Sequence, residues 1–384
     1  MDVIYLDNAA TTWPKPEPVL KSVENCMANY GANPGRGGHR LSRLAGEKVE
    51  ETRRRLARLF QIRDPRNLIF CQNGTHGINL SLKGWLNPGD HVVATTWEHN
   101  AVVRPLEMLK KTRGIEVDYI PPGSEEPVDL HRLEKALGSR TRLIVATHAS
   151  NVTGVLLPVG EIGNIARRRG IPLLVDAAQT AGVVPIDVES MGISMLAFSG
   201  HKGLMGPQGT GGLYISPELS LRSLMEGGTG SHSEQLWQPE ERPTGFESGT
   251  PNTPGIAGLD AGVQFLSEQG MESIRQHESL LAQQISEGLS RMEGIRVYTP
   301  GSSSVPVVSF NVEGVDGNEV AAILDQHYEI AVRSGFHCAA LAHQTLGTAD
   351  TGTIRVSPGF FNTDQDVEAL LQAVGEIRES YGMG

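Results

Sequence analysis

The sequence predicts an α/β fold built on a largely parallel sheet. Short apolar runs such as Leu173–Asp176 and Met195–Ser199 alternate with amphipathic segments of helical period over most of the chain. Continuous apolar runs are typical of buried strands, and their alternation with helices favours right-handed crossovers between parallel strands. Polar residues follow several of these runs, at the strand ends where the active-site residues of α/β enzymes usually lie.

The expected strands and helices follow one another in a regular order. Seven apolar runs are predicted to be strands: Leu68–Cys71, His91–Thr95, Val117–Ile120, Leu143–Thr147, Leu173–Asp176, Met195–Ser199 and Gly212–Ile215. Amphipathic segments between them predict helices: Leu41–Phe60, Ala101–Thr112, Leu130–Leu137 and Val159–Arg169.

The pattern changes after about Pro254. The preceding segment, Gly227–Pro254, is rich in Gly, Pro, Ser and Thr and is predicted to be a long loop, which inside a compact domain is usually functional. The mixture of helices and short strands beyond it predicts a smaller α+β domain. Its expected elements are helices over Gly255–Gln269, Met271–Met292, Asn318–Gln326 and Thr363–Tyr381, and a strand over Thr353–Ser357.

Length and composition are those of a folded chain that can hold two packed domains. Of its 384 residues, 39% are hydrophobic and 20% are charged. The net charge of −11 leaves no basic field that would bind nucleic acid. We interpret the arginine runs Arg53–Arg55 and Arg167–Arg169 as solvated helix faces.

The sequence carries no visible targeting or metal-binding signal. The amino terminus has neither a basic nor an apolar leader region, and no stretch has the length needed to span a bilayer. The cysteines, Cys26, Cys71 and Cys338, lie far apart, and the histidines lack the spacing of metal ligands. We therefore expect a cytoplasmic protein with no metal, no membrane contact and no nucleic-acid partner.

An acid and a lysine stand at the ends of two successive apolar runs. Asp176 lies in IPLLVDAAQT, shortly before Gln179, and Lys202 lies in MLAFSGHKG after Ser199 and His201. Pyridoxal phosphate requires such a pair, because a lysine binds it covalently and an acid keeps its ring nitrogen protonated. A structural ion pair is the simpler interpretation of an isolated Asp and Lys, but the surrounding polar residues favour the cofactor.

Other polar groups are expected at the same edge of the sheet. The turn Gln72–Gly77 lies between a predicted strand and a helix that we expect to open at Ile78. Its N–H groups would suit a phosphate, with Thr75 adding a hydroxyl, although many such turns are ordinary helix caps. His99 and Asn151 each follow an apolar run as well.

Cys338 is the candidate nucleophile. It lies in RSGFHCA, between Arg333 and Ala339, in a stretch that is predicted to be an exposed loop. Positive neighbours stabilise a thiolate, whereas a cysteine in a core strand, as expected for Cys71, is inert. Arg333 and Arg355 could each bind a carboxylate through two hydrogen bonds, and surface salt bridges are the alternative for either.

Taken together, an ordered set of segments resembles the class V aminotransferase superfamily. From residue 5 to about residue 362 the chain reads YLDNAATTWP, EHNAVVRP, SNVTG, VDAAQ, SGHKGLMGPQGTGGLYI, FESGTPNTPGIAGL and RSGFHCA. The chain is most similar to the cysteine desulfurase branch, with its SufS-type, group II enzymes and selenocysteine lyases. The resemblance implies fold type I: a large domain over 15–254 that binds pyridoxal phosphate, a small domain from 1–14 and 255–384 that carries Cys338, and a homodimer.

The resemblance also implies a role for each matching residue. Lys202 would bind the cofactor, His99 would stack on its ring and serve as an acid–base group, and Cys338 would accept sulfur. The other cofactor ligands would be Thr75, Asn151, Asp176, Gln179, Ser199 and His201, with Thr250 of the other subunit. Asn151, Arg333 and Arg355 would bind the substrate carboxylate.

The implied reaction converts L-cysteine to L-alanine, with a persulfide on Cys338 that passes to a sulfur acceptor, for example for iron–sulfur cluster assembly. Two positions depart from the family pattern: His76 stands where many members have an acid, and Phe336 replaces the first histidine of the common His-His-Cys. The short interval between Cys338 and Arg355 favours group II. A SufE- or SufU-like protein is one candidate acceptor.

Two alternatives stay open. One is a selenocysteine lyase or another class V lyase, epimerase or transaminase, although a transaminase needs no nucleophilic thiol. The other is a noncatalytic scaffold that binds pyridoxal phosphate and forms no alanine from cysteine, against which Lys202 and Cys338 both argue. A nucleotide-binding protein is disfavoured, because neither GxGxxG nor a P-loop follows a predicted strand.

Overall fold

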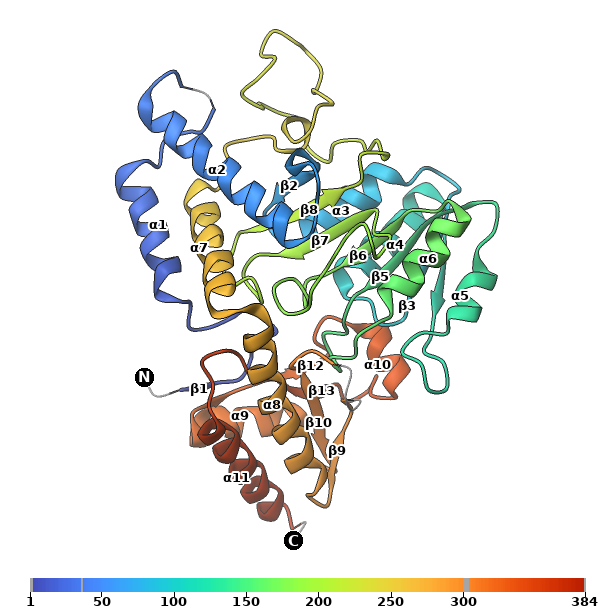
Figure 1. Ribbon diagram of the computed structural model, residues 1–384. Coiled ribbons are helices and arrows are strands. Elements are labelled where there is room, and N and C mark those ends of the chain that lie inside the picture. The colour runs from blue at the N-terminus through green and yellow to red at the C-terminus, as the bar shows by residue number, and fades with distance from the viewer. Residues whose placement is uncertain (1–2, 36, 300–303, 383–384) are drawn as a thin grey trace.

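The computed structural model describes residues 3–35, 37–299 and 304–382. A seven-stranded sheet organises the larger part of the molecule and a four-stranded sheet the smaller part (Figure 1). A parallel pairing of β1 (Ile4–Tyr5) with β11 (Ile330–Ala331) ties the start of the chain to the smaller part.

The large sheet has the strand order β2-β8-β7-β6-β5-β3-β4. Strands β7, β6, β5, β3 and β4 run parallel, and β8 is antiparallel to both β7 and β2. The carboxyl ends of β2, β7, β6, β5 and β3 therefore lie at one edge, which we call the carboxyl edge. All seven predicted strands are confirmed: β2 Leu68–Cys71, β3 His91–Thr95, β4 Glu116–Ile120, β5 Thr141–Thr147, β6 Leu173–Asp176, β7 Met195–Ser199 and β8 Gly211–Ile215.

Helices cover both faces of this sheet (Figure 1). α2, α5, α6 and α7 contribute apolar side chains to the core on one face, and α3 and α4 to the core on the other. The helices of this part are α1 Glu17–Asn29, α2 Arg40–Leu59, α3 Gly74–Trp85, α4 Asn100–Arg113, α5 Leu130–Ala136, α6 Val159–Arg169 and α7 Thr253–Gln269, with a short 3-10 helix at Pro65–Asn67. The predicted fold class, α/β with a mainly parallel sheet, is confirmed.

Helix α1 was not predicted. It buries Val19 and Cys26, and its exposed Leu20 and Met27 continue the same stripe at helical spacing, so a helical period is present in this segment. It packs along α7, which supplies the tertiary contact that the local pattern does not reveal.

The smaller part is an antiparallel sheet covered by helices. Its strand order is β12-β13-β10-β9, and its apolar core is closed by residues from α8, α9 and α11. The bounds are β9 Ile295–Val297, β10 Val308–Val312, β12 Arg333–Gly335, β13 Thr353–Val356, α8 Met271–Ser290, α9 Gly317–Tyr328 and α11 Asp364–Ser380. The short helix α10 (Ala340–Leu346), which was not predicted, follows Cys338 and shares a small apolar cluster with Trp97 and Val152.

The position of the boundary between the two parts is a proposal. Leu6 belongs to the core of the smaller part. Leu259 and Val263 of α7, however, pack in the core of the large sheet. We therefore propose a boundary near Gly270, between α7 and α8, in place of the predicted division at residue 254.

The predicted long loop connects β8 to α7. Apart from a 3-10 turn at Thr244–Phe246, it is irregular up to residue 252, and it projects beyond the edge of the large sheet (Figure 1). Within this loop Leu236 and Trp237 are 98% and 73% exposed. None of the helices within the described ranges combines the length and apolarity of a membrane-spanning segment.

Arg53 is buried, with 1% of its surface exposed, so the predicted solvated face is wrong at this residue. Its Nη1 and Nη2 donate to the Glu247 carboxylate at 2.7 and 2.9 Å, and Nη1 also donates to the carbonyl oxygen of Leu68 at 2.6 Å. Arg54 beside it is exposed. The partner that neutralises Arg53 lies far along the chain, where a local pattern of charge does not show it.

Candidate active site

Polar side chains from four strand ends meet along the carboxyl edge. Asp176 is the last residue of β6 and Ser199 the last residue of β7, with Lys202 shortly after it. Asn151 follows β5, and His99 follows β3 as the N-cap of α4. The buried apolar strands determine where each polar residue emerges, so the parallel register places all of them at one edge.

Lys202 and Asp176 are electrostatically coupled in a poorly solvated region. Burial and the charge of Arg355 lower the pKa of Lys202 to about 8, while Asp176 acts in the opposite direction. Asp176 is 4% exposed, and burial raises the pKa of its carboxyl although the backbone N–H of Ala178 donates to it at 2.9 Å. About a tenth of Lys202 is therefore a neutral amine at pH 7, far more than for an ordinary lysine, and attack on a carbonyl requires this form.

The start of α3 lies against the end of β7. The helix begins at Gly74, so the predicted start at Ile78 is wrong and the turn itself is the helix N-terminus. Asn73 caps it by accepting from the backbone N–H of His76 at 2.9 Å, and the N–H of Gly74 donates to Ser199 Oγ at 3.2 Å. A Cβ atom on Gly74 would lie 3.0 Å from Ser199 Oγ, so glycine permits the close approach. Thr75 is exposed at this N-terminus, which suits an anion.

The N-terminal segment packs against the loop that carries Lys202. Thr12 Oγ1 donates to the carbonyl oxygen of Lys202 at 2.8 Å, and Lys15 Nζ donates to that of His201 at 2.8 Å. Gln179 Nε2 donates to the carbonyl oxygen of Ala9 at 3.1 Å. Burial lowers the pKa of His201 to about 4, and its Nδ1 atom is buried with no hydrogen-bond partner among the described residues.

His99 is a neutral imidazole of defined orientation. Its Nδ1 atom accepts from the backbone N–H of Ala101 at 3.0 Å, so the ring proton resides on Nε2. Burial, followed by the charges of Lys202, Arg333 and Arg355, lowers the pKa of His99 to about 4. The ring therefore remains uncharged at neutral pH beside several cations.

Arg355 is the best candidate for a carboxylate ligand. It is 1% exposed, its Nη2 pairs with Asp7 Oδ1 at 2.6 Å, and its Nη1 donates to the carbonyl oxygen of Asn151 at 3.1 Å. Its Nε atom is buried and has no partner among the described residues. Arg333 on β12 lies opposite Arg355 in the register of the antiparallel pair β12–β13.

Cys338 is the exposed cysteine of the chain, and Cys26 and Cys71 are buried. Its Sγ atom lies 3.8 Å from Arg333 Nη2, which brings the predicted nucleophile and one predicted carboxylate ligand together. Burial raises the pKa of the Cys71 thiol, in agreement with an inert residue of a core strand.

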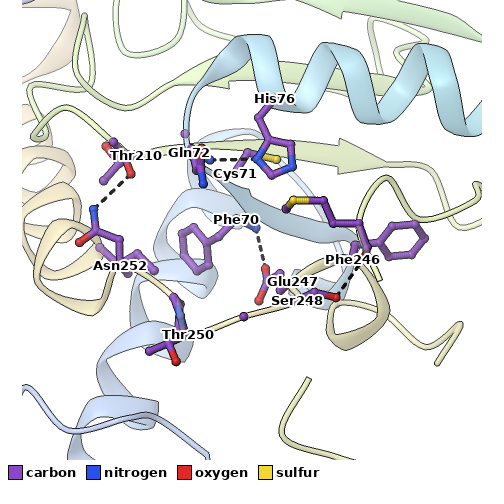
Figure 2. A pocket seen from close by; sticks show the side chains of 16 residues that line it. Phe70, Cys71, Gln72, His76, Thr210, Phe246, Glu247, Ser248, Thr250 and Asn252 are labelled. Carbon is purple, nitrogen blue, oxygen red and sulfur yellow. Dashed lines mark hydrogen bonds between the residues drawn. The ribbon is translucent and has the colours of Figure 1, made fainter. Parts of the chain in front are cut away.

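Thr250 is exposed in the segment before α7. It lines a cavity of about 170 Å³ between the start of α3 and the segment before α7, together with His76, Phe246 and Asn252. Figure 2 shows Thr250 and His76 on opposite sides of this cavity. None of the other predicted site residues lines the cavity, so the role of Thr250 in the second subunit's site stays a prediction.

The residues at the carboxyl edge fit pyridoxal phosphate. A lysine with a lowered pKa can bind its aldehyde, and a buried carboxylate can pair with its ring nitrogen. The exposed N-terminus of α3, the Ser199 hydroxyl and the unpartnered Nδ1 atom of His201 supply donors for its phosphate. Among the described residues no group of three or more His, Cys, Asp or Glu side chains could hold a metal ion.

Three residues that sequence reasoning missed contribute to the site. Asp7 pairs with Arg355, and the backbone N–H of Asn100 donates to the carbonyl oxygen of Cys338 at 2.7 Å. Glu98 is fully buried, and its Oε1 accepts from Thr95 Oγ1 at 2.6 Å and from the backbone N–H of Thr147 at 2.7 Å. Glu98 follows an apolar run directly before His99, which was a usable signal.

Comparisons with known proteins point to the same family over nearly the whole chain. A family model described as aminotransferase class-V matches residues 4–370. A probable cysteine desulfurase of Methanothermobacter thermautotrophicus is 36% identical, covering 100% of this chain and 96% of its own length. A cysteine desulfurase of Haloferax volcanii is 32% identical, covering 99% of this chain and 90% of its own length.

Solved structures are similar over the same length. The apo structure of cysteine desulfurase from Thermococcus onnurineus superimposes with a TM-score of 0.93 at 36% identity, covering 99% of this chain and 95% of the other. The S-sulfonic acid form of the cysteine desulfurase CsdA from Escherichia coli gives 0.90 at 29% identity, covering 98% and 95%. The chain therefore belongs to the class V aminotransferase family, with fold type I and pyridoxal phosphate as its cofactor.

Proposed function

We propose that this enzyme is a cysteine desulfurase that converts L-cysteine to L-alanine and collects the sulfur as a persulfide on Cys338. The observation that carries the proposal is the exposed Cys338 thiol beside Arg333, at the same edge as Lys202 and Asp176. A transaminase has no use for such a thiol. Relatives that match nearly the whole chain bear the name cysteine desulfurase.

Each residue has a task that follows from its surroundings. Bound pyridoxal phosphate supplies an electron sink for the bonds at the substrate Cα. The neutral amine of Lys202 takes the Cα proton, and Arg355 binds the carboxylate of the amino acid. Asp176 would pair with the ring nitrogen and Gln179 would donate to the phenolic oxygen, while Thr75, Ser199 and His201 would hold the phosphate.

Sulfur transfer then takes place at Cys338. Its thiolate attacks the substrate sulfur, an S–S bond forms, and the C–S bond breaks so that its electron pair stays with the carbon fragment, which is protonated to alanine. Neutral His99 carries its proton on Nε2, so it can donate that proton to the carbon fragment and then accept the proton of the transferred sulfur at the same atom. The persulfide passes to an acceptor, which the exposure of Cys338 permits.

The wider context of the reaction is part of the same proposal. We infer a group II enzyme that acts as a homodimer in the cytoplasm and supplies sulfur for iron–sulfur cluster assembly. Asn151 and Arg333 complete the carboxylate site, and Thr250 reaches the phosphate of the second subunit. The short segment between Cys338 and β13 supports the group II assignment.

The proposal is tested by alanine release from L-cysteine in the presence of a reductant. We expect equal amounts of alanine and sulfide from the wild type, no turnover from Cys338→Ser, and unchanged visible absorbance of the bound cofactor in that variant. Cys26→Ala, which removes a buried thiol outside the site, serves as the matched control with wild-type turnover.

Other outcomes point to the alternatives. A Cys338→Ser variant with wild-type rate would show that Cys338 does not carry sulfur, as in a direct lyase. A wild type that binds the cofactor but forms no alanine from L-cysteine, and does so from L-selenocysteine, would be a selenocysteine lyase. A wild type that binds the cofactor but is inactive with both amino acids would be a noncatalytic scaffold.

A further inference from the structure

We propose that Asn151 is a positioning residue whose side-chain amide bridges the substrate carboxylate and the turn that carries Cys338. We call Phe336–Ala339 the Cys338 turn. The inference deepens the proposed function and rests on it, because it takes the ligand beside Arg355 to be the carboxylate of an amino acid.

The Cys338 turn has a strained backbone. His337 and Cys338 have φ values of 46° and 59°, so two successive residues with side chains occupy the left-handed region. Such conformations are unfavourable for residues other than glycine, and they persist only where surrounding contacts hold them. The position of the Cys338 thiol therefore depends on those contacts.

The carbonyl groups of the two strained residues are both held by the large part of the molecule. Asn151 Nδ2 donates to the carbonyl oxygen of His337 at 2.7 Å, and the backbone N–H of Asn100 donates to that of Cys338 at 2.7 Å. Asn151 lies in the loop after β5, and Asn100 is the first residue of α4. On the other side the His337 ring lies 3.0 Å from the carbonyl oxygen of Thr353 on β13.

Asn151 also adjoins the candidate carboxylate ligand. Its carbonyl oxygen accepts from Arg355 Nη1 at 3.1 Å. Asn151 Oδ1 and Arg355 Nε are both buried and lack a hydrogen-bond partner among the described residues. Two unpartnered buried atoms on linked residues indicate a place where a ligand with both donors and acceptors completes the hydrogen bonding.

One amide can serve both sides at once. Nδ2 carries two hydrogens that point in different directions, and the bond to the His337 carbonyl uses one of them. The second hydrogen is left for the carboxylate, and a charged acceptor polarises the amide and strengthens its other bond. Binding of the carboxylate thereby stiffens the Cys338 turn and sets the thiol against the substrate sulfur.

Amide hydrogen exchange of the peptide covering the Cys338 turn tests the bridge in the cofactor-loaded protein. Without ligand, Asn151→Ala should exchange about threefold to tenfold faster there than the wild type, the factor that corresponds to one ordinary hydrogen bond. Asn151→Asp, which keeps the shape but removes the donor, should exchange equally fast. The matched control is Asn311→Ala, which removes an amide donor to the Gly352 carbonyl and should leave this peptide unchanged.

Two amines, one with a carboxylate and one without it, show which part of the ligand acts on the Cys338 turn. L-Alanine should slow exchange of the turn in the wild type, whereas L-alaninol, which has the amine but no carboxylate, should not. Neither should slow it in Asn151→Ala. Equal exchange in the wild type and Asn151→Ala, equal effects of the two amines, or an unchanged turn with L-alanine would each overturn the bridge.

Failure of the bridge and failure of the proposed function give different results. If alanine release from L-cysteine is absent but the exchange pattern is as expected, the bridge stands and the enzyme acts on another amino acid. If alanine is released at the expected stoichiometry but Asn151 does not affect the turn, the desulfurase stands and the bridge is wrong.

Discussion

Lys202 illustrates how burial adjusts a single residue for its task. Burial and Arg355 lower its pKa from 10.5 to about 8. Since only the neutral amine reacts with an aldehyde, covalent uptake of pyridoxal phosphate by the apoprotein should accelerate about tenfold per pH unit below pH 8 and level off above it. Stopped-flow absorbance measures this rate. A profile that still rises near pH 10 would indicate a lysine with an ordinary pKa.

Glu98 should make the stability of the protein depend on pH. Burial raises the pKa of its carboxyl from 4.5 to about 8, and its Oε2 atom has no partner among the described residues. Because the native state holds this proton more tightly than the unfolded state, the stabilisation is present below pH 4.5 and is lost as the pH rises to about 8.

The substitution Glu98→Gln keeps the acceptor oxygen and cannot ionise. Between pH 5 and pH 8 the wild type should therefore lose free energy of unfolding relative to Glu98→Gln, on the order of 3 kcal/mol. Urea unfolding at the two pH values measures the difference. Parallel changes in both proteins would mean that Glu98 is ionised in the native state throughout this range.

Helix α2, edge strand β2 and the segment before α7 are joined by the ion pair of Arg53 and Glu247. Glu247 Oε1 accepts from the backbone N–H of Phe70 at 2.6 Å as well as from Arg53 Nη1, so the pair ties three elements together. Figure 2 shows the hydrogen bond between Phe70 and Glu247, which line the same cavity as Thr250. These contacts of Glu247 hold the segment that carries Thr250 against α2 and β2.

Breaking this pair should be costly, because removal of one partner leaves an uncompensated buried charge. Arg53→Met should lower the free energy of unfolding by about 3–5 kcal/mol. Arg54→Ala, which removes the exposed neighbour in the same helix, should change it by less than about 0.5 kcal/mol. Chemical denaturation compares the two variants. Similar losses of free energy of unfolding in both would show that the buried pair of Arg53 and Glu247 does not stabilise the fold.

The whole molecule should be complete only as a dimer. Thr250 is exposed, and the cavity that it lines does not include Lys202. If it contributes to the site of the second subunit, mixed dimers of Thr250→Ala and Lys202→Ala chains contain one site with both residues. In an equimolar mixture half of the dimers are mixed and each has one intact site of two, so the mixture should recover about a quarter of the wild-type cofactor content, whereas each variant alone should bind the cofactor weakly.

Absorbance of the bound cofactor after unfolding and refolding the two chains together measures this recovery. Thr250→Ala chains that are unfolded and refolded alone provide the reference for weak cofactor binding. No recovery in the mixture would place Thr250 in the site of its own chain, and size-exclusion chromatography with light scattering would show separately whether dimers form.

Sequence reasoning located the strands of the large sheet well because each is a continuous apolar run. It missed α10, which has only seven residues, and it missed α1, although the apolar residues of α1 follow a helical period. Asp176, Ser199, Asn151 and His99 could be assigned to one edge because parallel strands share a direction. The ordered motifs added the family, its cofactor and the candidate roles.

The sequence by itself determined the fold class, the family and the identity of the candidate site residues, because these depend on local apolar patterns and on motifs. The tertiary structure decided which groups meet across large separations: Arg53 with Glu247, Arg355 with Asp7, and Asn151 with the turn at Cys338. It also decided which charges are buried, and hence the lowered pKa of Lys202 and the raised pKa of Glu98. Desolvation and the pairing of distant charges depend on the packed interior, and no local stretch of sequence contains that information.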